Sequence, residues 1–361
     1  MRRIIINFVK ARPMTTPFAV LLRIAALVFS LMALVGCSND TPATDTASAP
    51  PPAVVVYSAR AEQLIKPLFD AYTAETGVPV QYTTDSEQPL IQKLLAEGQT
   101  TPADLLLTVD AGNLWYAAEQ GVLRPIRSEI LEANIPAQLR DPEHQWFAMS
   151  VRARTLVYDK RTVDPTELSD YAALADEKWR GKLCLRTSAK VYNQSLVAML
   201  IAQFGEQRTE EIVRGWVANL ATDVFPNDTK LIEAIAAGQC QVGIVNTYYF
   251  GRLQKDNPEI PVALFWPAAS TGGVHVNVSG AGVTRHARNP EGAQKLLEWM
   301  SQPAAQRILG GENMEYPANP AVAADPLVQA WGVFDASPMN VARAGENQAD
   351  AVRLMDRAGY R

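Results

Sequence analysis

Histidine and cysteine are scarce in this chain, with three of each among 361 residues. Imidazole and thiolate groups are the usual zinc ligands, and no two of the histidines have a spacing typical of a shared metal ion. The metalloprotease motif HExxH is absent as well. We therefore interpret the histidines as surface or hydrogen-bonding side chains rather than ligands; they are His144, His275 and His286.

The motifs of several large enzyme classes are also missing. The chain has no GxGxxG fingerprint, no P-loop and no G-x-S-x-G elbow, which disfavours nucleotide-binding and hydrolytic functions. Carboxylates are plentiful, but no nucleophile can be paired with a base. The net charge of −5 and the pI near 5.4 also make nucleic acid an unfavourable partner. A binding protein is therefore a better first hypothesis than an enzyme.

The first 37 residues have the pattern of an export signal. Basic residues precede an apolar stretch over residues 24–35, which is too short for a comfortable transmembrane span. The stretch ends in LVGC, which resembles a bacterial lipoprotein box cleaved before Cys37. Cys37 would then carry a lipid and anchor the protein to a membrane. The alternative is a plain secretory signal with a chance cysteine, and either Met1 or Met14 could be the start.

The segment after Cys37 is polar and rich in proline. Its composition predicts a flexible tether over residues 38–53. With Cys37 assigned to the lipid, Cys184 and Cys240 remain, and an even number of cysteines in an exported chain favours a disulfide. Two separate buried thiols are the alternative.

Hydrophobic patterning predicts an α/β fold. The length of 361 residues and the hydrophobic content of 48% suggest a large core and about two domains. Near the start of the mature chain, apolar strands alternate with helices, which predicts a parallel sheet. The strands are expected at 53–60, 78–84 and 103–110, and the helices at 62–76, 88–97 and 111–120.

Two longer strands could connect two lobes. One is predicted over residues 145–159, and the other, over 273–287, is expected to cross back. We predict further strands and helices at 179–188, 193–204, 209–220, 229–237, 240–247 and 290–300. The predicted division is lobe 1 from 54–150 plus 272–325, lobe 2 from 151–271, and a C-terminal helical segment over 326–361.

Two segments of the chain share one layout. Cys184 is followed eight residues later by Tyr192, and Cys240 is followed eight residues later by Tyr248, with Tyr249 beside it. In each segment a short apolar run predicts a strand that leads into the tyrosine. Ligands of open α/β sheets bind beyond the carboxyl ends of the strands, so we expect these phenols to meet in a cleft. For any single tyrosine, half-buried packing is the alternative.

Converging phenols suit a hard, highly charged cation. A phenol has an unperturbed pKa of ~10, so it binds a metal at neutral pH only when a strong Lewis acid displaces its proton. Ferric iron can do so, whereas calcium and magnesium prefer carboxylates and carbonyls. Three phenolates leave coordination positions open for an anion, which guanidinium groups could hold. The candidates are Ser58, Arg60 and Arg152, and Arg154 cannot be separated from Arg152 because the two share a strand face.

Several motifs match one family in order along residues 54–320. VYNQSLVA and GIVNTYYFGRL are specific, and VVVYSAR, SVRARTLVYDK, HVNVSGAGV and EYPANP support them. With these motifs the chain resembles the ferric-iron-binding periplasmic proteins of bacterial ABC importers. The resemblance implies a two-lobed periplasmic binding protein fold (type II), in which two mixed sheets flanked by helices are joined by a hinge. It also implies a monomer that binds iron(III) through Tyr192, Tyr248 and Tyr249 and delivers it to a membrane permease.

One part of the family pattern is missing. Many relatives supply a histidine or tyrosine ligand in the turn after the first strand, where this chain has Ala61 and Glu62. It therefore resembles the subtype that uses three tyrosines plus a bound anion such as carbonate. Glu62 could instead offer a carboxylate, although an acidic residue at a helix start is stabilising in itself. Tyr57 could either line the cleft or pack beneath it.

A second function remains open within the same fold. The ligand could be an organic anion or a polyamine, with the tyrosines stacking on it and the arginines supplying charge. A visible absorption band from phenolate-to-iron charge transfer would separate the two functions.

Overall fold

The computed structural model describes residues 51–361. The predicted export signal, the predicted lipidation site Cys37 and most of the predicted tether lie outside the described residues. Residues 51–361 belong to one compact unit. Within them, no helix has both the length and the apolar character needed to cross a membrane.

The chain begins with the predicted alternation of strands and helices. β1 pairs in parallel with both β2 and β3, and helices follow each of these strands. Helix α1 ends where Gly77 adopts a left-handed conformation, with φ of 71°, and donates its N–H to the carbonyl of Thr73. The elements are β1 (Val54–Ser58), α1 (Glu62–Thr76), β2 (Val80–Thr84), α2 (Glu87–Glu97), β3 (Leu105–Val109), α3 (Ala111–Glu119) and α4 (Glu129–Asn134).

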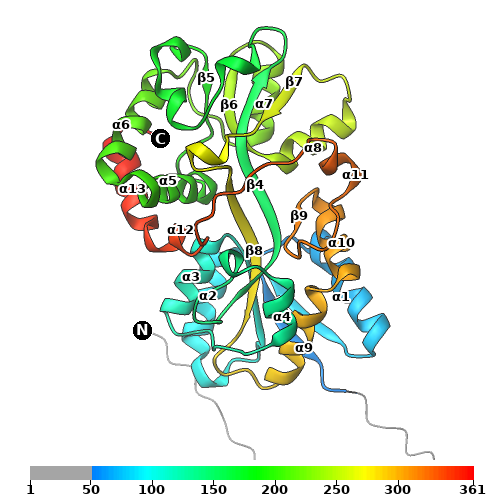
Figure 1. The fold of residues 1–361 in the computed structure, drawn as a ribbon. Coiled ribbons are helices and arrows are strands. Elements are labelled where there is room, and N and C mark those ends of the chain that lie inside the picture. The colour runs from blue at the N-terminus through cyan, green and yellow to red at the C-terminus, as the bar shows by residue number, and fades with distance from the viewer. Residues whose placement is uncertain (1–50) are drawn as a thin grey trace, which may run out of the picture. The chain divides into compact units, whose positions relative to one another are not determined.

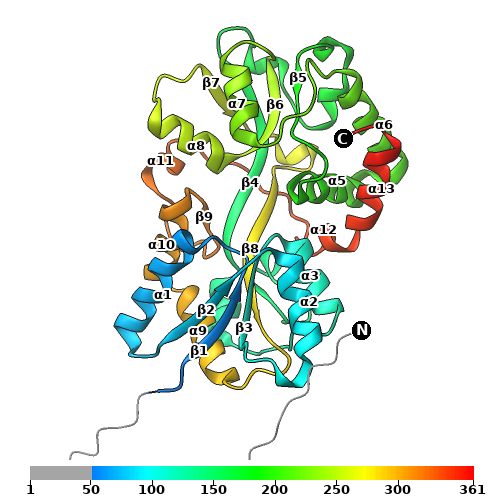
Figure 2. The same ribbon diagram turned by 180° about the vertical axis from the view of Figure 1, so that it is seen from behind.

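Two long strands, β4 (Phe147–Asp159) and β8 (His275–Val283), run side by side through the middle of the described region (Figures 1 and 2). They pair antiparallel with each other, while β8 also pairs with β3 and β4 also pairs with β6. The strand order is β2-β1-β3-β8-β4-β6-β5, with β7 and β9 paired to β4.

The strands of the described region therefore form one nine-stranded hydrogen-bonded sheet, where we expected two sheets. The reason is the length of β4. Its 13 residues allow it to pair with β8 over its first part and with β6 and β7 over its last part. The two predicted sheets are thus joined through shared strands.

The second half of the chain supplies the remaining helices and short strands. We predicted a longer strand over residues 179–188, but β5 has only two residues. The segment pairs with β6 at only these two positions. The elements are β5 (Leu183–Cys184), α5 (Val191–Phe204), α6 (Glu206–Ala218), α7 (Asp228–Ala236), β6 (Val242–Asn246), α8 (Thr247–Asp256), β7 (Val262–Phe265), α9 (Pro290–Met300), α10 (Pro303–Asn313), β9 (Tyr316–Pro317), α11 (Pro326–Gln329), α12 (Arg343–Glu346) and α13 (Gln348–Arg357).

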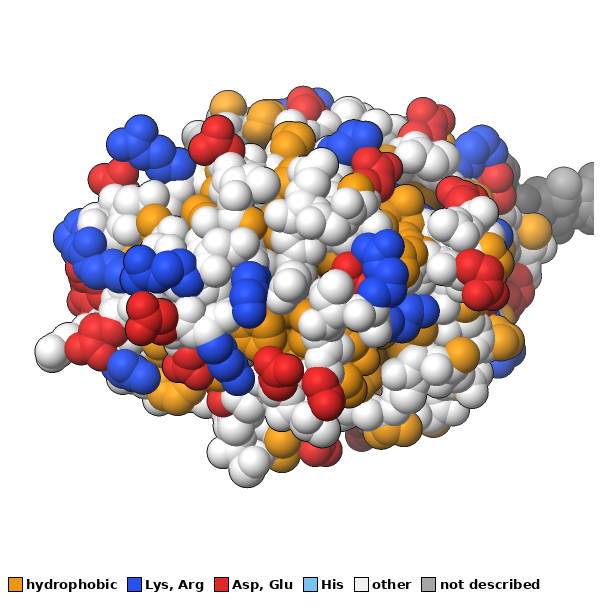
Figure 3. Space-filling model, turned by 90° about the horizontal axis from the view of Figure 1, so that it is seen from above, with side chains coloured by type: hydrophobic (Ala, Val, Ile, Leu, Met, Phe, Trp, Pro, Cys, Tyr) orange, Lys and Arg blue, Asp and Glu red, His pale blue; other side chains and the backbone are white. Residues whose placement is uncertain are grey.

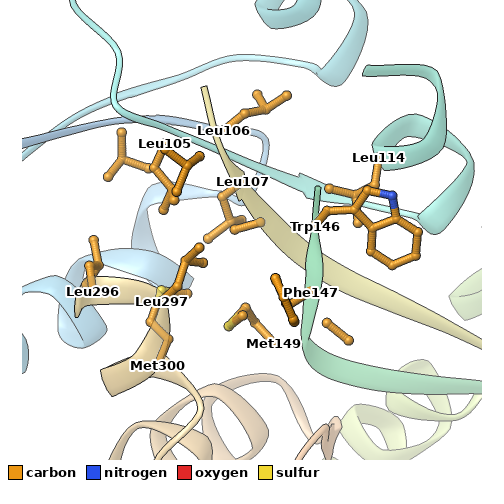
Figure 4. Packing of buried hydrophobic residues seen from close by; sticks show 14 of the residues in the cluster. Leu105, Leu106, Leu107, Leu114, Trp146, Phe147, Met149, Leu296, Leu297 and Met300 are labelled. Carbon is orange, nitrogen blue, oxygen red and sulfur yellow. The ribbon is translucent and has the colours of Figure 1, made fainter. Parts of the chain in front are cut away.

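The largest apolar core surrounds β1, β3 and the start of β4, and we call the elements packed on it the first lobe. Leucines of β3 meet apolar side chains of α9 and the bulky rings of the β4 segment (Figure 4). Burying each such side chain contributes about 2 kcal/mol. The labelled side chains are Leu105, Leu106, Leu107, Leu114, Trp146, Phe147, Met149, Leu296, Leu297 and Met300.

Two further apolar cores lie around β5, β6 and the end of β4, and we call the elements packed on them the second lobe. The C-terminal segment contributes to both lobes. Leu354 of α13 belongs to a core of the second lobe, whereas Val341 belongs to the core of the first. The predicted boundaries at 150 and 271 remain a prediction, and we propose that residues 326–361 are divided between the lobes.

Cys184 and Cys240 form the disulfide that the cysteine count favours. Their Cα atoms are 5.9 Å apart. The bridge joins β5 to the residues just before β6, and β5 and β6 are parallel neighbours in the sheet. The disulfide therefore fixes the two segments that lead to the tyrosines.

Charges of both signs share the surface of the described region. On the face seen from above Figure 1, lysine and arginine side chains alternate with aspartate and glutamate (Figure 3). This mixture is consistent with the small net charge of −5 over 361 residues.

Candidate functional site

A cavity of about 500 Å³ lies between the first and second lobes. The first lobe contributes the turn after β1 and the loop before α2, and the second lobe contributes the starts of α5 and α8. Arg152 of β4 and Glu315 after α10 complete the wall. The lining residues are Ala59, Arg60, Ala61, Leu64, Thr84, Asp85, Ser86, Glu87, Val109, Arg152, Lys190, Tyr192, Tyr248, Tyr249, Arg252, Asn313 and Glu315.

The three tyrosines occupy the first turns of two helices. Tyr192 is the second residue of α5, and Tyr248 and Tyr249 are the second and third residues of α8. Tyr248 and Tyr249 thus come just past the end of β6, as we expected, whereas Tyr192 comes eight residues after the end of the short β5. The N-terminus of a helix carries a partial positive charge, so both positions favour a phenol that becomes negatively charged.

The folded chain brings these phenols together. The hydroxyl of Tyr248 donates to that of Tyr192 at 3.2 Å, and the ring centroids of Tyr248 and Tyr249 are 4.4 Å apart. Tyr192 and Tyr248 are almost fully buried, with 9% and 4% of their surface exposed. The predicted convergence is therefore present as packing between the starts of two helices.

The surroundings of Tyr248 keep it protonated in the absence of a cation. Burial raises the pKa of Tyr248 well above its usual value, and negative charge on Tyr192 or Tyr249 would raise it further, while Arg152 opposes the shift. Several adjacent phenolates would repel one another in this dry environment. A strong Lewis acid is needed to form them.

Positive side chains surround the phenol rings. The Lys190 ammonium lies 4.7 Å from the Tyr192 ring centroid, and the Arg252 guanidinium lies 5.2 Å from that of Tyr248. These contacts are within cation–π distance. Sequence reasoning missed both cations, although Arg252 lies four residues after Tyr248 in a helix, a spacing that places two side chains on one face.

Arg60 is held in the first lobe beside the cavity. Its Nη1 donates to Ser150 Oγ at 3.2 Å, Ser279 Oγ at 2.9 Å and Glu315 Oε2 at 2.9 Å. Ser58, by contrast, accepts from the backbone N–H of Arg60 at 3.2 Å and so shapes the turn. Arg60 is 3% exposed, and its Nε and Nη2 have no hydrogen-bond partner among residues 51–361.

The structure separates Arg152 from Arg154. Arg152 lines the cavity and donates to the Val278 carbonyl at 2.9 Å, and its Nε is without a partner in the described part of the chain. Arg154 forms a buried ion pair with Asp228 at 3.0 Å and does not line the cavity. Of these two arginines of β4, Arg152 is therefore the one that can contact a ligand in the cavity.

Glu315 partly neutralises Arg60 and Arg152. Burial alone would raise the pKa of Glu315, but the charges of Arg60 and Arg152 outweigh it and leave this pKa below its usual value. Ser150 donates a further hydrogen bond to the carboxylate. Two guanidinium groups and one carboxylate leave one surplus positive charge, which suits a small anion.

Two residues of the first lobe lie away from the cavity. The Tyr57 hydroxyl donates to the Glu97 carboxylate at 2.9 Å, on the opposite face of β1 from Ser58 because neighbouring residues of a strand alternate. Tyr57 thus packs beneath the cleft. Glu62 accepts from the exposed Tyr82 hydroxyl at 3.2 Å and does not line the cavity, whereas Ala61 does.

The histidines have structural surroundings. His275 is buried, and burial together with the charges of Arg154 and Arg152 lowers its pKa to about 3. His144 contacts Arg127 at 2.9 Å and lies 3.6 Å from the Glu132 carboxylate. Across residues 51–361, no group of three or more His, Cys, Asp or Glu side chains is placed to hold a metal ion.

The chain matches a known family over most of its length. The model of the family described as bacterial extracellular solute-binding protein matches residues 67–336. The chain belongs to this family. Its members are binding proteins rather than enzymes, so the cavity residues are ligand-binding candidates.

Two relatives of this solute-binding protein come from the cyanobacterium Synechocystis sp. Iron uptake protein A1 is 39% identical over 337 residues, which are 92% of this chain and 93% of the relative. Iron uptake protein A2 is 41% identical over 322 residues, or 87% of this chain and 92% of the relative. The solute-binding protein therefore lies in the branch that contains iron uptake proteins.

Solved structures agree on the fold. The Trichodesmium protein in complex with iron and citrate ligands is 42% identical, with a TM-score of 0.82 over 86% of this chain and 100% of that one. Ferric iron-binding protein A of Mannheimia haemolytica, in an open conformation, is 32% identical, with a TM-score of 0.80 over 86% and 99%. These matches establish the α/β periplasmic binding protein fold that the sequence motifs implied.

Sequence reasoning also missed Glu315 of this solute-binding protein. The residue lies in the motif EYPANP, which supports the family resemblance, but its partner Arg60 is 255 positions away. A buried pair across that separation has no signal in local patterning. The motif alone could have drawn attention to its acidic residue.

Proposed function

We propose that this solute-binding protein of an ABC iron importer holds iron(III) between its lobes through the phenolates of Tyr192, Tyr248 and Tyr249. The observation that carries the proposal is the 3.2 Å contact between the Tyr192 and Tyr248 hydroxyls. It places two hard oxygen donors side by side, next to a third phenol and at two helix starts. The names of relatives support the metal, including the major ferric iron-binding protein of Neisseria meningitidis.

A small oxyanion completes the coordination in this proposal. Arg60 and Arg152 have buried N–H groups that lack a hydrogen-bond partner within residues 51–361, and such groups are costly unless they are satisfied. Carbonate fits because its flat oxygens match guanidinium donors. A related Trichodesmium structure contains citrate with its iron, so a carboxylate is the second anion to test.

The charges that line the cavity also bear on the two alternative ligands, a polyamine and an organic anion. Lys190, Arg252, Arg60 and Arg152 all line the cavity, together with the carboxylates of Asp85, Glu87 and Glu315. Within residues 51–361, Glu315 is the carboxylate that forms an ion pair with one of these four cations, at 2.9 Å from Arg60. Four cations and three carboxylates leave one surplus positive charge in the cavity lining, which disfavours a polyamine. An organic anion without iron is therefore the alternative occupant.

The protein works outside the cytoplasm, where its family acts. We propose in addition that Cys37 carries a lipid, so that the protein contacts the membrane only through this anchor. The support is the sequence LVGC at the end of the apolar stretch. Delivery of iron to a membrane permease follows from the family's role in ABC import.

Visible absorption tests the proposal. Addition of ferric iron and bicarbonate to the purified protein should produce a phenolate-to-iron charge-transfer band. Tyr192→Phe should weaken iron binding and diminish the band, whereas Tyr82→Phe, which lies outside the cavity lining, should change neither. The proposal fails if no band appears and Tyr192→Phe leaves the iron affinity unchanged.

A further inference from the structure

Arg186 contacts two of the three tyrosines without lining the cavity. Its guanidinium lies 5.4 Å from the Tyr192 ring centroid and 5.8 Å from that of Tyr249. Its Nη1 also donates to the Tyr249 hydroxyl at 3.4 Å. The side chain thus contacts both helix starts from the protein side of the rings.

Arg186 is held firmly in this position. It is 7% exposed, and its Nη1 lies 3.5 Å from the carboxylate of the fully buried Asp228. Its carbonyl accepts hydrogen bonds from Tyr360 Oη at 2.6 Å and from Asn193 Nδ2 at 2.9 Å. Because Arg186 also follows the disulfide-bonded Cys184 by two residues, both its backbone and its charged group are anchored.

The other cations near the rings do not make the same connection. Arg252 contacts Tyr248 and Tyr249, which belong to one helix, and Lys190 and Arg152 each contact the ring of Tyr192. Among the described cations with ring contacts, Arg186 reaches tyrosines of both α5 and α8. The disulfide holds the segments before these helices, but a ring can still rotate about its own side-chain bonds.

We propose that Arg186 is a positioning residue that sets Tyr192 of α5 relative to Tyr249 of α8. The inference rests on the proposed iron site. A planar guanidinium can donate to one phenol oxygen while its face contacts another ring, which a lysine ammonium cannot reproduce. Groups that orient metal ligands in this way typically change metal affinity about 10- to 100-fold when they are removed.

Two substitutions test this role. Arg186→Lys keeps a positive charge near Asp228 but removes the planar group, and Arg186→Gln removes the charge. In both variants Asp228 retains its ion pair with Arg154 at 3.0 Å, so folding should persist, which thermal unfolding would verify. Arg214→Gln is the control, since Arg214 is exposed and pairs with Glu210 within α6.

We expect both Arg186 variants to bind ferric iron about 10- to 100-fold more weakly than the wild type. Their charge-transfer band should move to longer wavelength, because a phenolate that loses a hydrogen-bond donor gives up its electron more easily. The control should match the wild type. A folded Arg186→Lys variant with wild-type affinity and band position would overturn the inference; if that variant does not fold, the same result for Arg186→Gln would do so. A wild type without the band would instead refute the iron site itself.

Discussion

The hydroxyl groups of Tyr192 and Tyr248 are 3.2 Å apart, although the two residues are 56 positions apart in the chain. Each lies in the first turn of a helix, and the segments before the helices are joined by the Cys184–Cys240 disulfide. A contact between two buried, neutral phenols contributes little to the stability of the fold. They become strong ligands when a trivalent cation removes their protons.

Iron affinity should rise with pH. Burial and the neighbouring phenols raise the pKa of Tyr248, so this residue is protonated in the iron-free protein and must release its proton when iron binds. Protons then compete with iron, and affinity should increase by about one decade per pH unit for each proton released. Competition titrations against a soluble ferric chelate, corrected for the chelate's own protonation, measure this slope. An affinity that does not depend on pH would contradict phenolate ligation.

Tyr57→Phe should leave iron binding unchanged. The Tyr57 hydroxyl donates to Glu97 beneath the cleft, and its loss should lower the free energy of unfolding by about 1 kcal/mol. Chemical denaturation and iron titration of the same variant measure the two effects. A loss of iron affinity comparable to that of Tyr192→Phe would show that Tyr57 does act in the cavity.

Glu315→Gln should make the protein more responsive to anions. This substitution leaves the buried Arg60 without its carboxylate partner, at a cost of about 3 kcal/mol in the free energy of unfolding. An oxyanion bound to Arg60 and Arg152 would restore part of this loss. Bicarbonate should therefore raise the unfolding temperature of the variant more than that of the wild type.

The matched control for this substitution is Glu312→Gln, on the exposed side of α10. Its response to bicarbonate should equal that of the wild type. An equal response of Glu315→Gln, Glu312→Gln and the wild type would mean that no anion binds at these arginines.

Removal of the disulfide should destabilise the protein and loosen the site. Closing a loop of 56 residues restricts the unfolded chain by about 4 kcal/mol in the loop-entropy model. The Cys184→Ala, Cys240→Ala double variant should therefore unfold at lower denaturant concentration. It should also bind iron more weakly, because the segments before α5 and α8 are no longer joined. Unchanged stability in the double variant would contradict this expectation.

Local sequence signals predicted the elements with strong boundaries. Helix 62–76 was predicted to the residue because Gly77 supplies a left-handed end, and helix 290–300 likewise, since Asn289 caps it and Pro290 starts it. The disulfide was also predicted from the sequence, as were the three tyrosines and Arg60, which line the cavity and whose function remains a prediction. These features depend on short spacing or on residue type.

The missed features depend on distant partners. Glu315 meets Arg60 across 255 positions. Arg186 contacts Tyr192 and Tyr249 only because the fold brings the starts of α5 and α8 together. Tyr57 could not be assigned to a face of β1 until its partner Glu97 was placed. In each case tertiary packing, rather than propensity, decides what the side chain does.

The most direct test is to locate the iron itself. Crystals of the iron-loaded protein, measured at the iron absorption edge, would show the metal by its anomalous scattering. We expect one peak within bonding distance of the hydroxyl oxygens of Tyr192, Tyr248 and Tyr249. A peak elsewhere, with these three oxygens beyond bonding distance, would contradict the proposed site.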